Sequence, residues 1–465
     1  MMKKILITVI AASLFTSCEK YLDVKPYGRT VPKTAEEFSA LIHAQLYNMD
    51  EGNFSSALLG NLSEFTSLDA VSGDDFETCL TKNSGRSLRI YAGEIVTNSG
   101  NYSQLYQTIR DCNIVLDEMK EQGTELSEKL RATAYAMRAV CYYQLLKYYC
   151  EVPEVGRMSA QLGVPLVTHF NMEYRPIRSS MQATVDLIES DLNKSIAYHN
   201  TDDLYRFTEY VCKGYLARLY FWTKQWDKVL PLTKELLVKY PILPINEFQT
   251  VMKKVNELGK NQLIKAYRTS NTTGQQFNLD TDILKYRPVS LRYLTHFLPA
   301  DTANDVRYKF FVSRSRVLIK PFFSGMRSEE FKLMEAECYY HLGRKSEALA
   351  SLNDLRSARI AHYTPMTEAD LPDINSKEII KVDATGASLT PLIAAILSER
   401  RKELFFEGDR FFEQKRNGSP EYWTAYNGSK YTTRKFMYTY PIPSLEIEIT
   451  SGLVQNPGYT EFVSN

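Results

Sequence analysis

The sequence predicts a mainly helical protein, an all-α fold in which TPR-like helix pairs form a scaffold that carries long irregular loops and few short strands. Three observations predict this fold. Apolar residues recur at three- and four-residue steps through much of the chain, and two segments fit the pattern of a tetratricopeptide (TPR) unit. The stretches between the periodic segments are long and rich in turn-forming residues.

Four helices are expected before residue 200. The first begins at a capping box formed by Thr34 and Glu37, directly before an apolar face that includes Phe38 and Ile42. The next three carry apolar stripes, and the expected limits are 102–123, with Gly123 as the stop, then 127–149, and then a helix from about residue 180.

Two later segments fit the TPR template, in which a small residue lets two helices approach and an aromatic ring fills the gap beside it. The matching positions are Leu216, Ala217, Tyr220, Trp226 and Pro241 in one segment and Ala336, Tyr339, Gly343, Ala348 and Leu352 in the other. A weaker copy lies around Ala139 and Tyr142. The units are unevenly spaced, so the repeats are degenerate and separated by insertions. A generic helical bundle is the alternative.

Four stretches have no helical period, namely residues 50–100, 242–328, 361–387 and 417–435. Loops of this length inside a compact domain commonly carry function. A rigid helical scaffold with elaborate loops is typical of a binding protein.

Composition excludes one class of partner. The 465 residues include 56 basic and 55 acidic side chains, a formal net charge of +1, so the chain lacks the electrostatic footprint of a nucleic-acid-binding protein. Tyr and Phe are abundant, at 31 and 22, whereas Trp occurs 3 times. Aromatic side chains suit packed helices and sugar- or peptide-binding surfaces equally well.

The N-terminal residues have the pattern of a signal peptide. Lys3 and Lys4 precede an uncharged stretch from Ile5 to Phe15, which as a helix would rise only about 16 Å, too short to span a bilayer. Ser17 followed by Cys18 resembles a lipobox, so Cys18 is expected to become a lipidated first residue. Two or more acyl chains would then anchor the mature body to a membrane. An ordinary secretory signal is the alternative.

Recognisable catalytic motifs, metal-ligand histidine spacing and C-x-x-C pairs do not occur, so we expect no cofactor, no metal and no enzymatic activity. Asp280 and Asp282 give only a weak hint of calcium, because the Gly and the distal Glu of an EF-hand are missing. A glycosidase carboxylate pair cannot be judged from chain spacing. Four cysteines lie in helical patterns and are expected to be small buried hydrophobes: Cys112, Cys141, Cys212 and Cys338.

Several motifs resemble those of the SusD/RagB family of nutrient-binding lipoproteins. They are the segment from Cys18 to Pro26, the helix pattern from Tyr102 to Asn113, residues 399–418, Tyr440-Pro-Ile-Pro443 and Gln455-Asn-Pro-Gly-Tyr459. In physical terms, 399–418 predicts a helix in which charged side chains pair along one side and aromatic ones enter the core. The charged set is Glu399, Arg400, Glu403 and Glu407, and the core set is Leu404, Phe405, Phe411 and Phe412.

The resemblance implies a lipoprotein on the outer face of the outer membrane that caps a SusC-like TonB-dependent transporter. It would bind an oligosaccharide, or else a peptide, and close it into the barrel without catalysis. The expected organisation is a signal peptide at 1–17 and one SusD/RagB-like domain at 18–465. This domain divides into 18–125, the TPR-like pairs at 126–242, a variable loop region at 243–328, and a third pair with the C-terminal signature at 329–465.

Loop residues are the candidates for ligand contact, because aromatic rings can stack on sugars or side chains while charged and amide groups satisfy polar atoms. The candidates are Asp74, Asp75, Arg89, Tyr91, Asn98, Tyr267, Tyr286 and Tyr293. For any one of them, loop packing is the alternative. For the whole protein, the alternatives are a TPR-like scaffold that binds only protein partners and a surface glycoside hydrolase.

Overall fold

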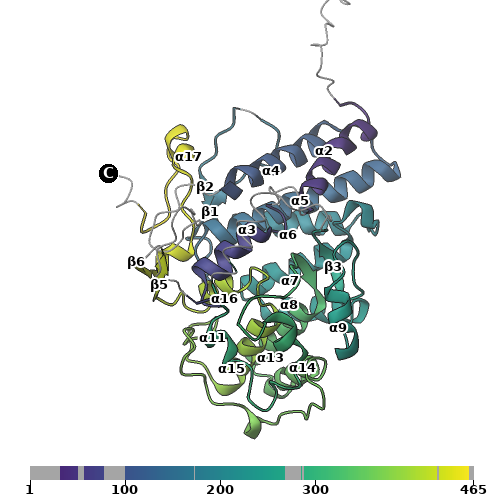
Figure 1. The fold of residues 1–465 in the computed structure, drawn as a ribbon. Coiled ribbons are helices and arrows are strands. Elements are labelled where there is room, and N and C mark those ends of the chain that lie inside the picture. Colours follow the sequence, from purple (N-terminus) through teal and green to yellow (C-terminus); the bar gives the residue numbers. More distant parts are fainter. Residues whose placement is uncertain are drawn as a thin grey trace, which may run out of the picture.

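The computed structural model describes residues 32–50, 57–77, 100–171, 173–267, 284, 287–426 and 429–459. Helices dominate the ribbon and strands are few and short (Figure 1), so the predicted all-α, TPR-like scaffold is confirmed. Within those ranges, none of the helices is both long and apolar enough to cross a bilayer.

The four predicted N-terminal helices form as α2 (Ala35–Asn48), α4 (Gly100–Glu118), α5 (Glu125–Tyr149) and α6 (Met181–Ile196). The prediction that residues 50–100 are irregular is partly wrong, because α3 (Leu62–Phe65) and η1 (Thr66–Ser72) lie there. The capping box of α2 is confirmed, because the hydroxyl of Thr34 accepts the amide of Glu37 while the Glu37 carboxylate accepts the amide of Thr34.

Helix α4 ends at Glu118, earlier than the predicted stop at Gly123. The guanidinium of Arg131 on α5 donates to the carbonyls of Leu116 and Met119. These carbonyls therefore find a partner outside the helix, and the helix can end before the glycine is reached.

Both predicted TPR-like pairs are confirmed. The first consists of α7 (Glu209–Trp222) and α8 (Trp226–Lys239), the second of α13 (Ser328–His341) and α14 (Lys345–Ser357). Gly343 occupies the turn of the second pair with a φ of +75°, a conformation that favours glycine. Trp226 stacks on His341 with ring centroids 4.5 Å apart, so the two pairs pack directly against each other.

The prediction that residues 242–328 are irregular is partly wrong. This region contains α9 (Ile245–Met252), β3 (Gln262–Lys265), α11 (Leu291–Leu294), α12 (Val306–Phe311) and β4 (Gly325–Arg327). Each element has eight residues or fewer, too few for a periodic pattern to stand out.

The strands of the described residues form antiparallel two-stranded sheets that decorate the helical body. They pair β1 (Leu162–Pro165) with β2 (Arg178–Ser180), β3 with β4, and β5 (Tyr422–Tyr426) with β6 (Ser429–Thr433). The remaining short elements are η2 (Asp203–Tyr205), η3 (Glu368–Asp370), η4 (Lys435–Tyr438) and α17 (Ser444–Ile449).

The segment 399–418 is two helices and not one. Helix α15 (Pro391–Glu403) is separated from α16 (Arg410–Arg416) by a turn in which Phe406 and Gly408 have φ values of +56° and +71°. The predicted aromatic core is confirmed, because Leu404, Phe405, Phe411 and Phe412 are buried.

The charged residues of this segment do not pair along one helix side as predicted. Glu403 accepts hydrogen bonds from the guanidinium groups of Arg307, Arg327 and Arg359, which lie in three other parts of the chain. Arg400 donates to Asp409, beyond the end of its own helix. The prediction used helical spacing, whereas these ion pairs are tertiary contacts. Within single helices, Glu399 pairs with Lys402 at 2.8 Å and Arg410 with Glu413 at 2.7 Å.

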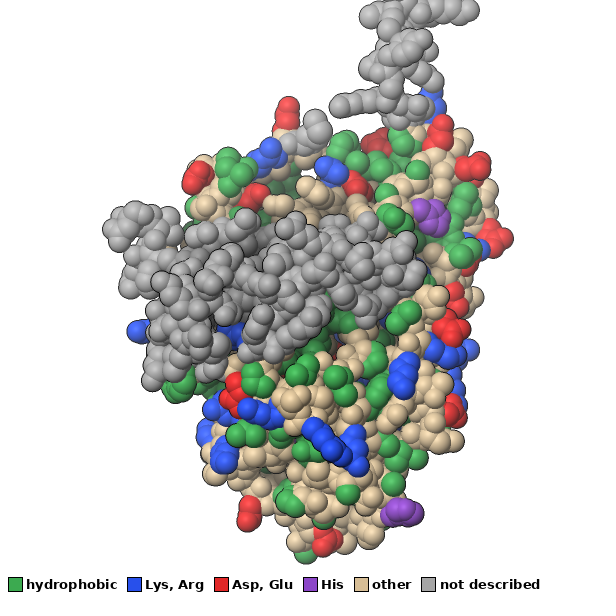
Figure 2. Space-filling model, viewed as in Figure 1, with side chains coloured by type: hydrophobic (Ala, Val, Ile, Leu, Met, Phe, Trp, Pro, Cys, Tyr) green, Lys and Arg blue, Asp and Glu red, His purple; other side chains and the backbone are tan. Residues whose placement is uncertain are grey.

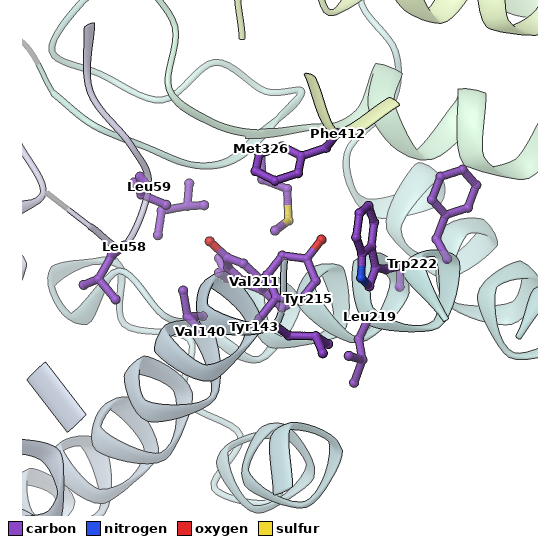
Figure 3. Close-up of a cluster of buried hydrophobic side chains, with 14 of the residues drawn as sticks. Leu58, Leu59, Val140, Tyr143, Val211, Tyr215, Leu219, Trp222, Met326 and Phe412 are labelled. Carbon is purple, nitrogen blue, oxygen red and sulfur yellow. The ribbon is translucent and has the colours of Figure 1, made fainter. Parts of the chain in front are cut away.

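One large apolar cluster joins segments far apart in the sequence. Figure 3 shows part of it, with side chains from the segment before α3, from α5 and α7, and from β4 and α16. The predicted burial of Cys112, Cys141, Cys212 and Cys338 is confirmed, and these thiols are free. Cys18 and Cys79 lie outside the described residues.

Candidate functional site

The early and middle regions predicted to carry the ligand contacts lie against each other. Phe76 and Val289 form an isolated β-bridge. Beside it, the amide of Glu77 donates to the carbonyl of Pro288 and the amide of Ser290 donates to the carbonyl of Asp75, each at 2.8 Å. Two segments more than 200 residues apart therefore form one surface.

The buried side chains of Asp74 and Asp75 connect this junction to helices α15 and α16 through hydrogen bonds. Asp74 accepts from Arg410 at 2.8 Å and Gln414 at 2.7 Å, while Asp75 accepts from Arg401 at 2.7 Å. Burial opposes ionisation of Asp74, but Arg401 and Arg410 outweigh it and lower its pKa to about 2. At Asp75 burial dominates and raises the pKa to about 6, although Arg401 opposes it.

Of the aromatic candidates, Tyr293 is fully buried and stacks on Phe405 with ring centroids 4.0 Å apart. Direct ligand contact by Asp74, Asp75 or Tyr293 would therefore require the interior to open. In this structure the three side chains position the loops.

Tyr267 is half-buried at the surface, and the guanidinium of Arg206 lies 4.2 Å from its ring centroid. Its amide donates to Asp50 at 2.8 Å. The other predicted residues lie outside the described residues: Arg89, Tyr91, Asn98, Tyr286, Asp280 and Asp282.

Exposed and half-exposed side chains lie on the segments that form the junction and on the neighbouring strand β5. We define the loop rim as Glu77, Leu291, Arg292, Arg316 and Trp423. Arg316 pairs with Glu77 at 2.8 Å, and Arg292 reaches Asp74 at 3.2 Å. Leu291 is 60% exposed and Trp423 is 52% exposed. The rim therefore combines apolar surface with charged groups of both signs, a combination that suits an uncharged, hydroxyl-rich ligand.

Trp423 is the rim residue that sequence reasoning missed. It lies on β5, and the hydroxyl of its neighbour Tyr422 donates to the carbonyl of Ser72, which fastens the hairpin beside the early region. The segment 417–435 was predicted to be irregular. Asn427-Gly428 between residues of high strand propensity is a hairpin signal that could have identified it.

A cleft with a volume of about 900 Å³ lies apart from the loop rim. It is formed mainly by loops at 151–154, 383–386, 418–421 and 456–458, and Phe436 is the one aromatic residue among the described residues that line it. Figure 2 shows that basic and acidic side chains are both spread over the described surface of one face of the molecule. The cleft offers little surface for stacking, so the loop rim is the better candidate for recognition of sugar rings.

The ion network beneath the rim predicts a pH dependence of stability. His296 is buried, with Ser398 at 2.9 Å and Glu378 at 3.0 Å from its ring nitrogens. Burial lowers its pKa to about 4, and the charge of Arg401 acts in the same direction, whereas the contact with Glu378 opposes the shift. The unfolded imidazole, with a pKa of about 6.5, takes up a proton first as the pH falls, so the native state loses stability between about pH 6.5 and 4.

We therefore expect the stability advantage of wild type over His296→Gln to shrink by about 2 kcal/mol between pH 7 and pH 5. Urea unfolding of both proteins at the two pH values measures this difference in the free energy of unfolding. Both proteins contain Asp75 and the other titrating carboxyls, so the effects of these groups cancel when the two proteins are compared. An advantage that stays constant would contradict a buried neutral imidazole.

Comparison with known families identifies the relatives of the chain. A family profile described as "Starch-binding associating with outer membrane" matches residues 20–221, and a profile described as "SusD family" matches residues 320–459. The chain belongs to the SusD/RagB family. The predicted resemblance is thus confirmed, and the two matches flank the middle region that supplies Leu291, Arg292 and Arg316 to the rim.

Solved SusD-type structures share this fold. A SusD superfamily protein from Bacteroides vulgatus has 18% identity and a TM-score of 0.70, over 92% of this chain and 100% of that chain. One from Bacteroides thetaiotaomicron has 18% identity and a TM-score of 0.68, over 91% and 100%. A laminarin-binding SusD-like protein has 18% identity and a TM-score of 0.61, over 92% and 100%. A comparison with curated proteins finds no match.

Proposed function

We propose that this SusD/RagB-family chain is a cell-surface lipoprotein that binds an oligosaccharide and delivers it, chemically unchanged, to a SusC-like TonB-dependent transporter in the outer membrane. The observation that carries the proposal is the match to SusD-type profiles at both ends of the chain. A relative with the same fold is described as laminarin-binding, which supports a glucan or similar glycan as the ligand.

The N-terminal sequence supports attachment through lipid at Cys18. The first described residue, Pro32, follows 14 residues later in the sequence.

Ligand capture would use the loop rim. The indole face of Trp423 would stack on a sugar ring, and Glu77, Arg292 and Arg316 would hydrogen-bond hydroxyl groups. Arg89, Tyr91, Asn98, Tyr267 and Tyr286 remain proposed ligand contacts. Asp74, Asp75 and Tyr293 would act by holding the loops, since their side chains are buried.

Replacing Trp423 with Ala is expected to weaken glycan binding about tenfold, which corresponds to about 1.4 kcal/mol of lost stacking. Tyr174→Ala is a matched control, because it removes another half-exposed ring, 53% exposed, from a loop outside the rim. Isothermal titration with the glycan that binds wild type measures both affinities. Equal affinity of wild type and the Trp423 variant would remove the rim from the site.

A further inference from the structure

A small cavity that is partly open to solvent lies away from the loop rim. It lies between the segment 59–68, α5, α7 and the two C-terminal helices α15 and α16, and its volume is about 100 Å³. A water molecule occupies about 30 Å³ in the liquid, so the cavity has room for a few waters or for one small ion.

Lys147 on α5 brings a positive charge to this cavity. Its ammonium lies 3.8 Å from the ring centroid of Phe412 and 5.5 Å from that of Tyr143. Among the ion pairs between described residues, none within 4.0 Å involves Lys147. Burial lowers its pKa to about 8, with the nearby charge of Arg218 acting in the same direction.

Two further hydrogen-bond donors in the lining have no partner in the described part of the chain. They are Nε1 of Trp222 and Nη1 of Arg400, and both residues are at least 95% buried. The Trp222 ring lies 6.2 Å from the ring of Phe412, which also contacts Lys147, and all of these residues line the same cavity together with Arg400. Buried donors without acceptors cost free energy unless a ligand or water satisfies them.

The carboxylates of the cavity wall are already engaged. Glu330 pairs with Arg218 at 2.6 Å, Glu407 with Arg327 at 3.0 Å, and Asp409 with Arg400 at 2.5 Å. Two further carboxyls line the cavity. Glu64 accepts a hydrogen bond from the hydroxyl of Tyr148, and Glu413 has one oxygen without a partner in the described residues, with a pKa that burial raises to about 7 against the charge of Arg410. Beside these carboxyls the wall offers two donors and one cation without a described partner, and such groups can bind an anion.

We propose that this cavity binds a small monovalent anion, chloride or a carboxylate of the size of formate, through Lys147, Trp222 and Arg400. The anion would bridge α5, α7 and α15, so its binding would stabilise the native state by mass action. The cavity volume excludes larger anions.

Thermal unfolding of the full chain in chloride, formate or glutamate at equal ionic strength tests the site, because glutamate is too large to enter. For wild type we expect a midpoint about 2 °C higher in chloride or formate than in glutamate. Lys147→Met should abolish this difference and Trp222→Phe should reduce it. Lys345→Met, which removes an exposed lysine on α14, should leave it intact.

An equal chloride effect in wild type and Lys147→Met would overturn the proposal, because general salt effects act on both proteins. Should Lys147→Met fail to fold, wild-type crystals soaked in bromide test the site instead, because the anomalous signal of bromide shows where the anion binds. An anomalous peak in contact with Lys147 and Trp222 supports the site, and bromide bound only at the surface overturns it.

Discussion

Replacing Glu403 with Gln is expected to lower the free energy of unfolding by about 3 to 5 kcal/mol, the usual cost of removing one partner from a buried ion pair. Glu403 is fully buried and accepts hydrogen bonds from Arg307 at 2.9 Å, Arg327 at 2.6 Å and Arg359 at 3.0 Å. All three arginines are also fully buried, so the substitution leaves guanidinium charges without their shared counter-charge.

The protonation state of Glu403 is set by the same contacts. Burial opposes its ionisation, but the three guanidinium groups hold its pKa well below the ordinary value. Because the folded pKa is depressed, the contribution of Glu403 is complete above the unfolded pKa of about 4.3 and is lost as the pH falls toward the folded pKa. The network is therefore fully formed at neutral pH.

Urea unfolding at pH 7 measures the effect. Glu347→Gln is the matched control, since Glu347 pairs with Arg344 at 2.9 Å on an exposed helix face and solvent screens that pair. The control should unfold at the wild-type midpoint. A Glu403→Gln midpoint that also equals wild type would show that the arginines do not depend on the shared carboxylate.

The second large effect is expected at Cys18. Cys18→Ala should move the protein from the outer-membrane fraction to the soluble fraction almost completely, because in the proposed function a diacylglycerol-modified thiol is the anchor and the body carries little net charge to hold it on lipid. Cell fractionation and metabolic labelling with palmitate measure this change.

Cys79→Ala is the matched control for Cys18, since the sequence gives Cys79 no part in anchoring. The control should remain in the membrane fraction and carry label. A Cys18→Ala protein that stays palmitate-labelled in the outer membrane would contradict the lipid anchor.

The long helices could be predicted because their signals are local. The capping box at Thr34 and Glu37 and the TPR-like positions around Ala217 and Gly343 depend on residues within a few turns of one another. The break between α15 and α16 could not be predicted in the same way. Phe406 takes a positive φ there, Asp409 pairs back across the turn with Arg400, and Glu403 pairs with Arg359 in another part of the chain.

The candidate site was harder to predict because burial of a polar loop residue is decided by distant partners. Asp74 and Asp75 have the appearance of ligand contacts in the sequence, yet Arg401 and Arg410, more than 300 residues away, draw them inside. Trp423 shows the opposite case. Its exposure follows from strand alternation beside Tyr422, which is half-buried and faces the molecule, a pattern that the irregular composition of the segment obscured.

The most direct test of the account is a titration of the mature protein with a panel of soluble glycans, including starch and laminarin fragments, and with peptides, followed by chromatography of the recovered ligand. The account predicts saturable binding of at least one glycan, which is recovered with its chain length unchanged. Binding of peptides alone, or recovery of shortened glycan, would contradict it.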